Sequence, residues 1–328
     1  MNSLRRTGIA AVLVVLAAFV LGPRPAKAQD FPTRSVRLVV PLSPGGVTDV
    51  MARLIATSMS KQLGQSVIVE NRTGANGAIA GDFVTRSAPD GYTVGFFPNS
   101  AVVVLPLLGK FTNATTDLKP VSKLYDLDLF VVTRSDHQAS TLAQLIAMAK
   151  AQPGKYSYGT TGIGSTLHLA MELLKRQGGF DMTHIPYRGG ADQLNALLGG
   201  NLDAAIIGTY DAGLWVKQGK IKILASLGPK RNIVFPDVPT LSESGFPGVV
   251  ASSWAALFVP TGTPPAIAER LAQAAGSALR DPVVRERLVS NGLTPVGDER
   301  PEDTSAAMRL ESEKWSKVIQ QLGAANLQ

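Results

Sequence analysis

Glycines and small polar residues gather in five short stretches of this sequence, and each stretch follows an apolar, strand-like run. They read SPGGVTD (43–49), GANGA (74–78), PNS (98–100), GTTGIGST (159–166) and PYRGG (186–190). Glycine lets a ligand approach the backbone closely, and the free N–H groups at a helix start favour an anion by about 0.3–1 kcal/mol. The chemistry that these residues suit best is the binding of a small anion such as a carboxylate.

Each stretch taken alone has an ordinary explanation, because turns of α/β proteins are often rich in glycine for conformational reasons. Their recurrence across both halves of the chain favours a shared site. In open α/β sheets, ligands bind beyond the carboxyl ends of the strands, where the next helices begin. We therefore expect these turns to form one binding cleft.

The motifs that would indicate nucleotide binding or acyl transfer are incomplete. GANGAIAG (74–81) lacks the Lys-Ser/Thr ending of a phosphate-binding loop, and GIGSTL (162–167) lacks the third glycine of the dinucleotide fingerprint. The G-x-S-x-G turn of α/β-hydrolases does not occur in the chain. We expect no cofactor.

The titratable residues do not form a recognisable catalytic or metal set. The histidines, at positions 137, 168 and 184, lack the spacing of metal ligands. His168 lies one turn after Ser165 and is favoured as a packed or capping residue over a base. Asp49 and Asp211 could act in catalysis, but no nucleophile–base pair accompanies them. An exported enzyme that acts on a small organic acid is the alternative to a non-catalytic binding protein.

Strand and helix patterns alternate along the chain. The first three strands with their two helices form a βαβαβ unit, which predicts a mostly parallel sheet. A second α/β unit starts after residue 120, and from about residue 250 the chain reads SSWAALFVP, followed by two or three C-terminal helices. Strands are expected at 36–40, 66–70, 92–97, 127–134, 156–160, 182–187, 202–207 and 221–226, and helices at 47–55, 77–87, 141–151, 165–177, 190–198 and 210–219.

The first 28 residues have the pattern of a secretory signal peptide. Two arginines precede an apolar run of 13 residues (9–21), and Ala26-Lys27-Ala28 forms a cleavage site that places the mature start near Gln29. The apolar run is shorter than the roughly 20 residues of a spanning helix. We expect a protein exported to the periplasm.

Charge and cysteine content exclude several classes of function. The formal charge of +7 falls to +3 when the four basic residues of the signal peptide are removed (7 − 4), and the remaining Lys and Arg are scattered. Binding to nucleic acid is therefore not expected. The chain has no cysteine, which excludes a lipid-modified cysteine, thiol catalysis and cysteine-based metal sites.

A family resemblance is carried by motifs that follow one another through nearly the whole mature chain. They include VRLVVPLSPGGVTDVMARL, NRTGANGAIAG, YGTTGIGSTLHLAMELL, HIPYRGG, LLGGNLDA, FPDVPTLSESGFPG and SSWAALFVPTGTP. The sequence resembles the periplasmic solute-binding proteins of tripartite tricarboxylate transporters, also called Bug proteins. Members of this family capture small organic acids and deliver them to two membrane subunits.

The resemblance implies an α/β fold with two domains, a Venus-flytrap binding protein of the type II-like class. The ligand cleft then lies between the domains, and two crossover segments join them. Residues 30–128 plus 250–328 would form a discontinuous first domain, and 129–249 the second. The resemblance also implies a monomer that binds by hinge closure.

The family's binding residues can be carried over to matching positions. In the first domain they are Ser43, Gly45, Gly46, Thr48, Asp49, Asn76, Ala78, Asn99 and Ser100. In the second domain they are Thr160, Thr161, Gly164, Ser165, His168 and the turn from Pro186 to Gly190, with Tyr187, Gly189 and Gly190. Trp254 lies in the family's SSW stretch, although core packing explains a tryptophan there equally well.

Two departures from the family pattern make the expected cleft less polar. Ile207 and Gly208 stand where the family often has Asp-Asn, and Ile163 stands where Asn is common. We therefore expect a ligand with an apolar body and one or two carboxylates, such as an aromatic or medium-chain dicarboxylate. Tyr210 and Trp215 could stack on such a body, with surface or core packing as the alternative for both. Asp211 is a further candidate ligand-binding residue.

Overall fold

The computed structural model describes residues 31–109, 114–296 and 300–323. The predicted signal peptide lies outside these residues. From Arg34 onward the chain forms one compact unit. Within the described ranges, no helix combines the length and the apolar character needed to cross a membrane.

The predicted βαβαβ unit is confirmed. Strand β1 (Val36–Val40) lies between β2 (Val67–Asn71) and β3 (Thr93–Pro98), and both neighbours are parallel to it. Helices α2 (Val47–Leu63) and α3 (Ala78–Thr85) connect these strands. The carboxyl ends of all three strands consequently point the same way, toward the turns that hold the glycine-rich stretches.

Helix α2 follows from its local sequence. Met51, Ile55 and Met59 recur at intervals of four residues, and all three are buried. The helix ends at Gly64, whose φ of 70° suits glycine best. It starts after Gly46, which has extended backbone angles and no side chain to cap the first N–H groups. Those groups are free to meet another partner.

A second parallel unit follows the same plan. Strand β5 lies between β6 and β7, parallel to both. Each of these three strands is followed by a helix, and strand β8 pairs with β4 (Leu118–Arg134). The elements are α6 (Leu142–Ala151), β5 (Ser157–Thr160), α7 (Thr166–Gly178), β6 (Thr183–Pro186), α8 (Gly190–Leu198), β7 (Ala204–Gly208), α9 (Thr209–Lys217) and β8 (Ile221–Ser226).

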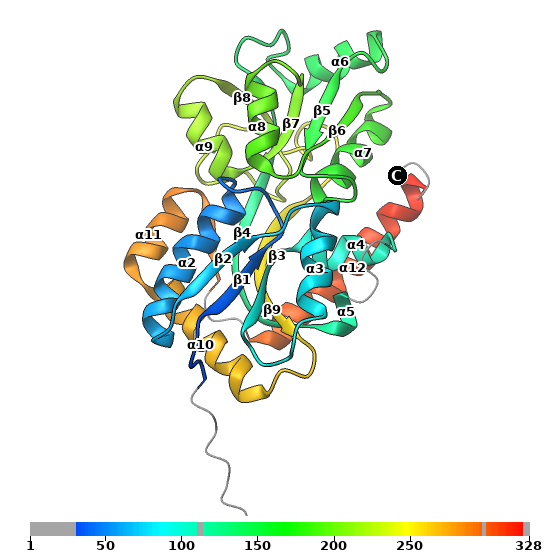
Figure 1. Ribbon diagram of the computed structural model, residues 1–328. Coiled ribbons are helices and arrows are strands. Elements are labelled where there is room, and N and C mark those ends of the chain that lie inside the picture. Colours follow the sequence, from blue (N-terminus) through cyan, green and yellow to red (C-terminus); the bar gives the residue numbers. More distant parts are fainter. Residues whose placement is uncertain (1–30, 110–113, 297–299, 324–328) are drawn as a thin grey trace, which may run out of the picture. The chain divides into compact units, whose positions relative to one another are not determined.

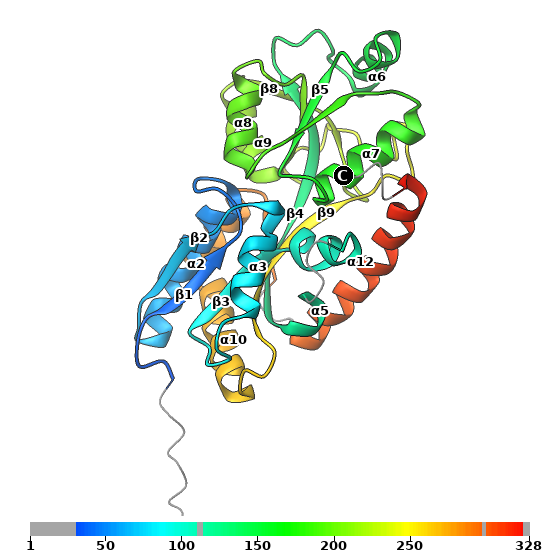
Figure 2. The same cartoon turned by 45° about the vertical axis from the view of Figure 1, so that its right-hand side comes forward.

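Two antiparallel strands join the two units, so the sheet is mixed and not mostly parallel as predicted. Strand β4 (Leu118–Arg134) pairs with β9 (Ser252–Pro260) as far as Asp128, and from Leu129 it pairs with β7 and β8. Figures 1 and 2 show both strands running between the two parallel units. The sequence pattern predicted β4 only from residue 127, because its first half contains Lys, Pro and Ser; the backbone of β9 supplies the pairing there.

The change of partner along β4 falls between residues 128 and 129, where the domain boundary is predicted. The return strand β9 begins two residues after the second predicted boundary, at 249/250. We call the part built on β1–β3 the first lobe and the part built on β5–β8 the second lobe. The domain ranges themselves stay a prediction.

Three helices follow β9 in the described ranges, in agreement with the expected two or three. Helix α10 (Pro265–Arg280) packs on α2, α11 (Pro282–Ser290) continues to the short strand β10 (Leu293–Pro295), and α12 (Pro301–Leu322) packs on α7 and β4. The short elements are η1 (Ala75–Gly77), η2 (Ser100–Val104), α4 (Leu105–Leu107) and α5 (Ala114–Asp117).

Trp254 belongs to the interior beneath α12. Its side chain is 2% exposed, and its Nε1 donates a hydrogen bond to Glu311 Oε1 at 2.6 Å. Glu311 also accepts a hydrogen bond from Asn99 Nδ2 at 3.0 Å. Trp254 and Asn99 therefore fix the C-terminal helix to the sheet, which is the packing explanation foreseen for the tryptophan.

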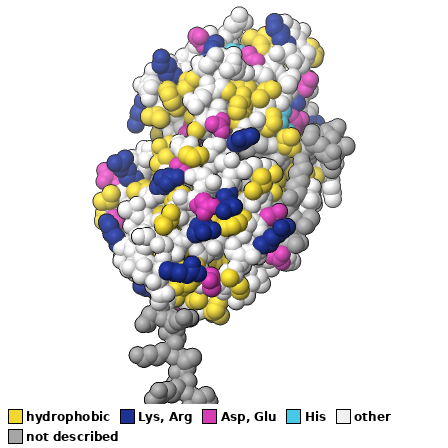
Figure 3. Space-filling model, viewed as in Figure 1, with side chains coloured by type: hydrophobic (Ala, Val, Ile, Leu, Met, Phe, Trp, Pro, Cys, Tyr) yellow, Lys and Arg dark blue, Asp and Glu magenta, His cyan; other side chains and the backbone are white. Residues whose placement is uncertain are grey.

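Basic and acidic side chains are interspersed on the face shown in Figure 3. Several basic groups have acidic neighbours, as in the Arg37–Glu70 and Arg34–Asp90 pairs at 3.1 and 3.2 Å. This face presents no continuous basic stripe of the kind that follows a phosphate backbone.

Candidate ligand-binding site

A small cavity lies where the turns of the two lobes meet. Its volume is about 60 Å³, well below the roughly 300–1,000 Å³ of most ligand pockets. Both lobes contribute to its wall. The lining residues are Leu42, Gly46, Val47, Thr48, Pro98, Ser100, Leu127, Leu129, Thr161, Leu167, Gly190, Gln193, Ile206, Ile207, Gly208, Asp211 and Ser253.

The N-termini of α2 and α8 face each other across this cavity. A Cβ atom placed on Gly46 would lie 3.6 Å from the backbone nitrogen of Ala191 and 3.7 Å from that of Gly190. Neither helix start carries a side-chain cap. Two sets of free N–H groups thus converge with the positive ends of two helix dipoles, which is an arrangement that favours an anion.

The remaining wall combines apolar side chains with hydroxyl groups. Leucine and isoleucine side chains from β4, α7 and β7 form the apolar part. Thr48, Ser100 and Thr161 supply hydroxyl groups, each of which can donate one hydrogen bond, whereas Ser253 Oγ donates to Asn99 Oδ1 at 3.2 Å. Ile207 lies in this wall and belongs to its apolar part.

Asp49 is buried but does not line the cavity. Its carboxylate accepts hydrogen bonds from Gly45 N and Asn71 Nδ2, both at 2.9 Å, and pairs with Arg53 at 2.9 Å. Burial alone would raise the pKa of Asp49, but these hydrogen bonds and the charge of Arg53 outweigh it and leave the pKa lowered. Asp49 is thus a satisfied anion that shapes the 43–49 turn.

Asp211 lines the cavity and has the opposite environment. Its side chain is 6% exposed, and its carboxylate makes no hydrogen bond or ion pair with any residue that the structure describes. Burial raises the pKa of Asp211 to about 7. It is the one charged residue among those that line the cavity.

Gln193 was not foreseen from the sequence. It is fully buried in the first turns of α8, and its Nε2 donates to the carbonyl oxygens of Gly159 and Ile206, both at 2.8 Å. Within the described ranges its Oε1 has no hydrogen-bond partner. A glutamine in an amphipathic helix gives no sequence signal for such a role, since its partners lie 34 and 13 residues away.

The turn after β2 brings a strained asparagine to the boundary of the lobes. Asn76 has a φ of 52° and is 8% exposed, and neither polar atom of its side chain has a partner among the described residues. A Cβ atom on Gly162, in the second lobe, would lie 3.3 Å from Asn76 Cβ. Asn76 therefore faces the β5–α7 turn, beside the cavity and outside its lining.

The β5–α7 turn is held by its own polar side chains. Ser165 caps α7 by accepting the N–H of His168 at 3.1 Å, and His168 Nδ1 accepts the N–H of Gly164 at 3.2 Å. The His168 ring stacks on His184 with 4.1 Å between centroids, and Thr160 Oγ1 lies 2.7 Å from His184 Nε2. Burial, followed by the neighbouring His168, lowers the pKa of His184 to about 3.

Direct contacts also join the two lobes at the rim of the cavity. Ser43 N donates to the carbonyl oxygen of Arg188 at 3.3 Å, and Ser43 Oγ donates to Asp192 Oδ2 at 2.7 Å. Gly189 packs against Ser43 so closely that a Cβ there would lie 2.9 Å from Ser43 N. These contacts hold the structure in a closed arrangement, in agreement with the small cavity.

The structure thus divides the predicted site residues into two groups. Those that line the cavity are Gly46, Thr48, Ser100, Thr161, Gly190, Ile207 and Asp211. Those outside its lining are Ser43, Gly45, Asp49, Asn76, Ala78, Asn99, Thr160, Gly164, Ser165, His168, Tyr187, Gly189 and Tyr210. Trp215 packs against the apolar core of the second lobe instead of the cavity.

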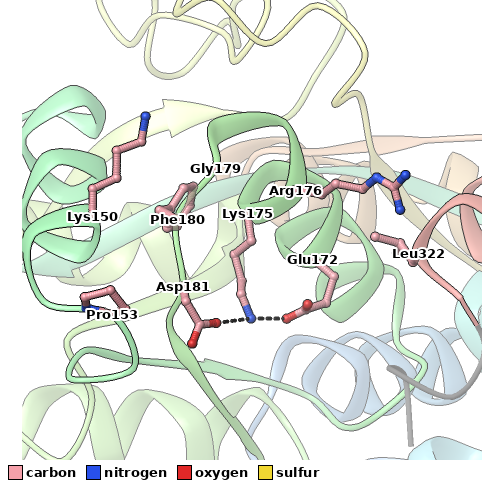
Figure 4. A pocket seen from close by; sticks show the side chains of 9 residues that line it. All are labelled: Lys150, Pro153, Glu172, Lys175, Arg176, Gly179, Phe180, Asp181 and Leu322. Carbon is pink, nitrogen blue, oxygen red and sulfur yellow. Dashed lines mark hydrogen bonds and ion pairs between the residues drawn. The ribbon is translucent and has the colours of Figure 1, made fainter.

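A larger pocket on the second lobe has a different character. It has a volume of about 530 Å³ and is lined by residues of α7, the segment 179–181, Lys150 and Pro153 at the end of α6, and Leu322 of α12. Figure 4 shows the Lys175 amino group between Glu172 and Asp181, at 2.8 and 3.2 Å. Because these carboxylates already pair with the lysine, the pocket attracts an anion less strongly than its number of basic residues suggests. No three His, Cys, Asp or Glu side chains in the described ranges are grouped to hold a metal ion.

Comparison with known proteins identifies the family. The model of the tripartite tricarboxylate transporter family receptor matches residues 51–324. The chain belongs to this family. It is a periplasmic solute-binding protein of the Bug type, and the resemblance noted in the sequence is confirmed.

Solved structures of family members agree in fold over most of the chain. The periplasmic binding protein BugD is 30% identical, with a TM-score of 0.84 over 90% of this chain and 99% of its own. MatC of Rhodopseudomonas palustris with bound malate is 31% identical, with a TM-score of 0.85 over 88% of this chain and 100% of its own. Rpa4515 of R. palustris with adipate is 31% identical, with a TM-score of 0.82 over 89% and 98%. The fold is that of an α/β periplasmic binding protein.

Proposed function

We propose that this protein captures a small carboxylate between its two lobes and delivers it to a tripartite tricarboxylate-type membrane transporter. The observation that carries the proposal is the meeting of two uncapped helix N-termini, at Gly46 and Gly190, across one cavity. Backbone N–H groups at such ends can bind a carboxylate without an arginine. The hydroxyl groups in the wall add donors for the same anion.

The ligand that fits the wall best is an acid with an apolar body, an aromatic or medium-chain acid among them. The leucine and isoleucine side chains favour such a body, and relatives of similar fold carry malate and adipate. An affinity near micromolar requires about 8 kcal/mol, which a few carboxylate hydrogen bonds and buried apolar surface can supply.

Binding is proposed to proceed by hinge closure. The cavity of about 60 Å³ is too small for such an acid to enter with the rim contacts in place, so the lobes must separate first. A ligand that contacts both lobes then stabilises the closed form, which the two membrane subunits would recognise. We place the hinge in strands β4 and β9. Strand β4 pairs with β9 in the first lobe and with β7 in the second lobe, and β9 is the strand by which the chain returns to the first lobe. The protein is proposed to act as a monomer in the periplasm.

The first test is a thermal-shift screen of the chain from Gln29 against mono-, di- and tricarboxylates. A ligand at about 100 times its Kd should stabilise the protein by roughly 2.7 kcal/mol, which gives a clear rise in Tm. No shift with any carboxylate would contradict the proposal. Recovery of the ligand unchanged after long incubation separates binding from the alternative of an exported enzyme, which would consume it.

A matched pair of glycine variants tests the site itself. Gly46→Ala places a methyl group at 3.6 Å from Ala191 N, a distance that the fold accommodates but that covers the converging N–H groups. We expect the Kd to rise at least about tenfold, since one lost charge-assisted hydrogen bond costs about 1.5–3 kcal/mol. Gly213→Ala on α9, where a Cβ would meet nothing within 4 Å, is the control and should leave the Kd unchanged.

A further inference from the structure

A second depression that both lobes share lies beside the hinge strand β4. Its volume is about 370 Å³, and Leu127 is the one residue that lines both it and the ligand cavity. Its wall is formed by residues 229–234, which follow β8, by residues 126–128 of β4, and by residues of α11 and the segment 292–295. We call it the junction pocket.

The two lobes touch each other next to the junction pocket. A Cβ placed on Gly292, between α11 and β10, would lie 2.1 Å from Thr209 Cγ2 at the start of α9 and 3.5 Å from Val234 Cγ2. These contacts join the first lobe to the second directly. The shape of the junction pocket therefore depends on how the two lobes are placed relative to each other.

Apolar side chains of both lobes are exposed around this pocket. Ile233 is 91% exposed, Val234 40% and Val289, on α11, 53%. Single exposed apolar residues are normal on a protein surface, but a group of them around one depression is typical of a site that contacts another protein. The junction pocket thus has the composition of an interaction surface.

The exposure of Ile233 is imposed by its neighbour. Asn232 is 6% exposed, and its Nδ2 donates to Asp128 Oδ2 at 2.7 Å. Its Oδ1 accepts the N–H groups of Val234 and Phe235 at 2.8 and 3.3 Å. Because Asn232 is held inward at the residue where β4 changes partner, Ile233 is held outward. A side chain that is already in place loses little conformational freedom when a partner binds it.

The exposed and unpaired charges of the junction pocket are positive. Arg231 and Asp126 each form an ion pair at 2.9 Å with a residue outside the lining. Asp128 is half-buried and accepts the hydrogen bond described above. Lys230 and Arg285 are exposed and form no ion pair with any residue that the structure describes. A partner with acidic side chains would complement them.

A periplasmic loop of a membrane protein fits these features best. Lys and Arg of membrane proteins are concentrated on the cytoplasmic side, so the loops on the other side carry few positive charges that would oppose Lys230 and Arg285. An apolar side chain of a loop can fill a depression, whereas a flat lipid surface cannot. Because both lobes form the wall, a loop bound there contacts a surface that changes when the lobes close.

We infer that the junction pocket is the surface by which this protein docks on its membrane transporter. Ile233 is the apolar anchor, and Lys230 and Arg285 contact acidic side chains of a periplasmic loop of a membrane subunit. The inference rests on the proposed function, because it presupposes delivery to such a transporter. It does not depend on which acid the protein carries.

Site-specific photocrosslinking in living cells of the source bacterium tests this inference. p-Benzoylphenylalanine is placed at position 233 of the full-length chain, and the crosslinked products are identified by mass spectrometry. The main product should contain a membrane subunit of a tripartite tricarboxylate transporter. Its yield should exceed the yield from position 310 by about tenfold or more. Leu310 is a matched control, since it is 67% exposed on α12.

A charge reversal tests the expected acidic partner. With the photoreactive residue at position 289, Arg285→Glu should lower the yield of the product with the membrane subunit by about tenfold. Arg309→Glu reverses the charge of an exposed arginine on α12 and should leave the yield unchanged. Thermal unfolding of both variants checks that neither substitution disturbs the fold.

The outcomes separate the inference from the proposed function. If position 233 yields only a second copy of this chain or crosslinked lipid while position 310 yields the membrane subunit, the inference is wrong and delivery to a transporter stands. The same holds if Arg285→Glu gives the wild-type yield. If none of the exposed positions 68, 214, 233, 283 and 310 yields a membrane subunit, the proposed delivery fails, and the inference fails with it.

Discussion

Two aspartates occupy equivalent positions in two helices and meet opposite environments. Asp49 is the third residue of α2 and Asp211 the third residue of α9, and each helix starts after a glycine with extended backbone angles. Both side chains are less than a tenth exposed. Asp49 is surrounded by donors and has a lowered pKa. Asp211 has no donor among the described residues, and burial raises its pKa to about 7.

We interpret the difference as a division of roles, in which the turn at Asp49 serves stability and the turn at Asp211 is proposed to serve the ligand. A helix start favours a nearby carboxylate, but that effect is worth at most about 1–2 kcal/mol and does not offset complete burial. At Asp49 the chain supplies the missing hydrogen bonds itself. At Asp211 it does not, and a buried group with a perturbed pKa in a cavity is typical of a functional site.

Asp192, the third residue of α8, lies between these extremes. It is exposed, and its Oδ2 accepts a hydrogen bond from Ser43 Oγ across the rim of the cavity. Helices α2, α8 and α9 thus each carry an aspartate as the third residue. One aspartate stabilises its own turn, one joins the lobes, and one lines the cavity. Substituting each of them tests this division.

The largest change in the free energy of unfolding is expected when Asp211 is substituted. Its folded-state pKa of about 7 lies above the unfolded value of 3.8, so the folded protein retains a proton that the unfolded chain releases. Stability is therefore lost as pH rises from about 4 to about 7. Asp211→Asn removes this loss and should raise the free energy of unfolding of the unliganded protein at pH 8 by up to about 4 kcal/mol, against less than about 1 kcal/mol at pH 4.

Urea unfolding at the two pH values measures this difference, with Asp82→Asn in α3 as the control for removal of an exposed charge. If Asp211→Asn is no more stable than the wild type at pH 8, Asp211 has a partner in solution, and the contrast with Asp49 disappears. The expected gain in stability comes with a loss of ligand affinity, as is common for residues of binding sites.

A change of opposite sign in the free energy of unfolding is expected when Asp49 is substituted. Each carboxylate oxygen of Asp49 accepts from two donors. In Asp49→Asn one of these oxygens becomes an NH2 group, which cannot accept and faces two donors in either orientation of the amide. We expect a loss of about 1–3 kcal/mol in the free energy of unfolding at pH 7, chiefly from the bonds to Gly45 N and Asn71, since Arg53 is half exposed. Because the pKa of Asp49 is lowered in the folded state, this stabilisation is present at neutral pH and disappears as pH falls through the folded value.

Urea unfolding from pH 7 down to pH 3 follows this loss. The difference between Asp49→Asn and the wild type should shrink as the wild-type carboxyl becomes protonated. Ligand affinity measured on the same variant should be that of the wild type. A change of affinity as large as that of Asp211→Asn would mean that Asp49 contacts the ligand after all.

The smallest effect is expected at Asp192. Its bond to Ser43 is exposed, so Asp192→Ala should change the free energy of unfolding by less than about 1 kcal/mol. If the bond stabilises the closed form, the ligand should dissociate a few-fold faster, which stopped-flow displacement measures. Ser43→Ala should give the same increase, and the double variant should add nothing to either. Additive effects of the two variants would show that the bond does not act during closure.

The local elements were predictable because their signals are local. Apolar runs located β1, β3, β7 and β8, and the spacing of Met51, Ile55 and Met59 located α2. The first half of β4 escaped prediction, since residues such as Lys119 and Pro120 have low strand propensity and pair there with β9, more than 130 positions later. The mixed sheet follows from the same pairing of β4 with β9, which no local sequence pattern predicts.

The candidate site was predictable as a set of turns and not as a set of side chains. The strand ends and glycines indicated where helix N-termini would gather, and Gly46, Thr48, Ser100 and Gly190 do line one cavity. The same reasoning grouped Asp49 with Asp211. Gln193 had no sequence signal, because the orientation of its side-chain amide is set by two carbonyl oxygens, of β5 and β7, to which its Nε2 donates hydrogen bonds.

The sequence by itself determined the strand–turn–helix units, the glycine at each turn and the aspartate at the third position of α2, α8 and α9, since each depends on residues within a few positions. Only the tertiary structure decided which aspartate would find partners. Asn71, which satisfies Asp49, lies 22 residues away on the next strand, and no equivalent donor reaches Asp211 from the described residues. Hydrogen bonds and desolvation depend on what the fold brings within about 3 Å, and that distance is set by packing between elements.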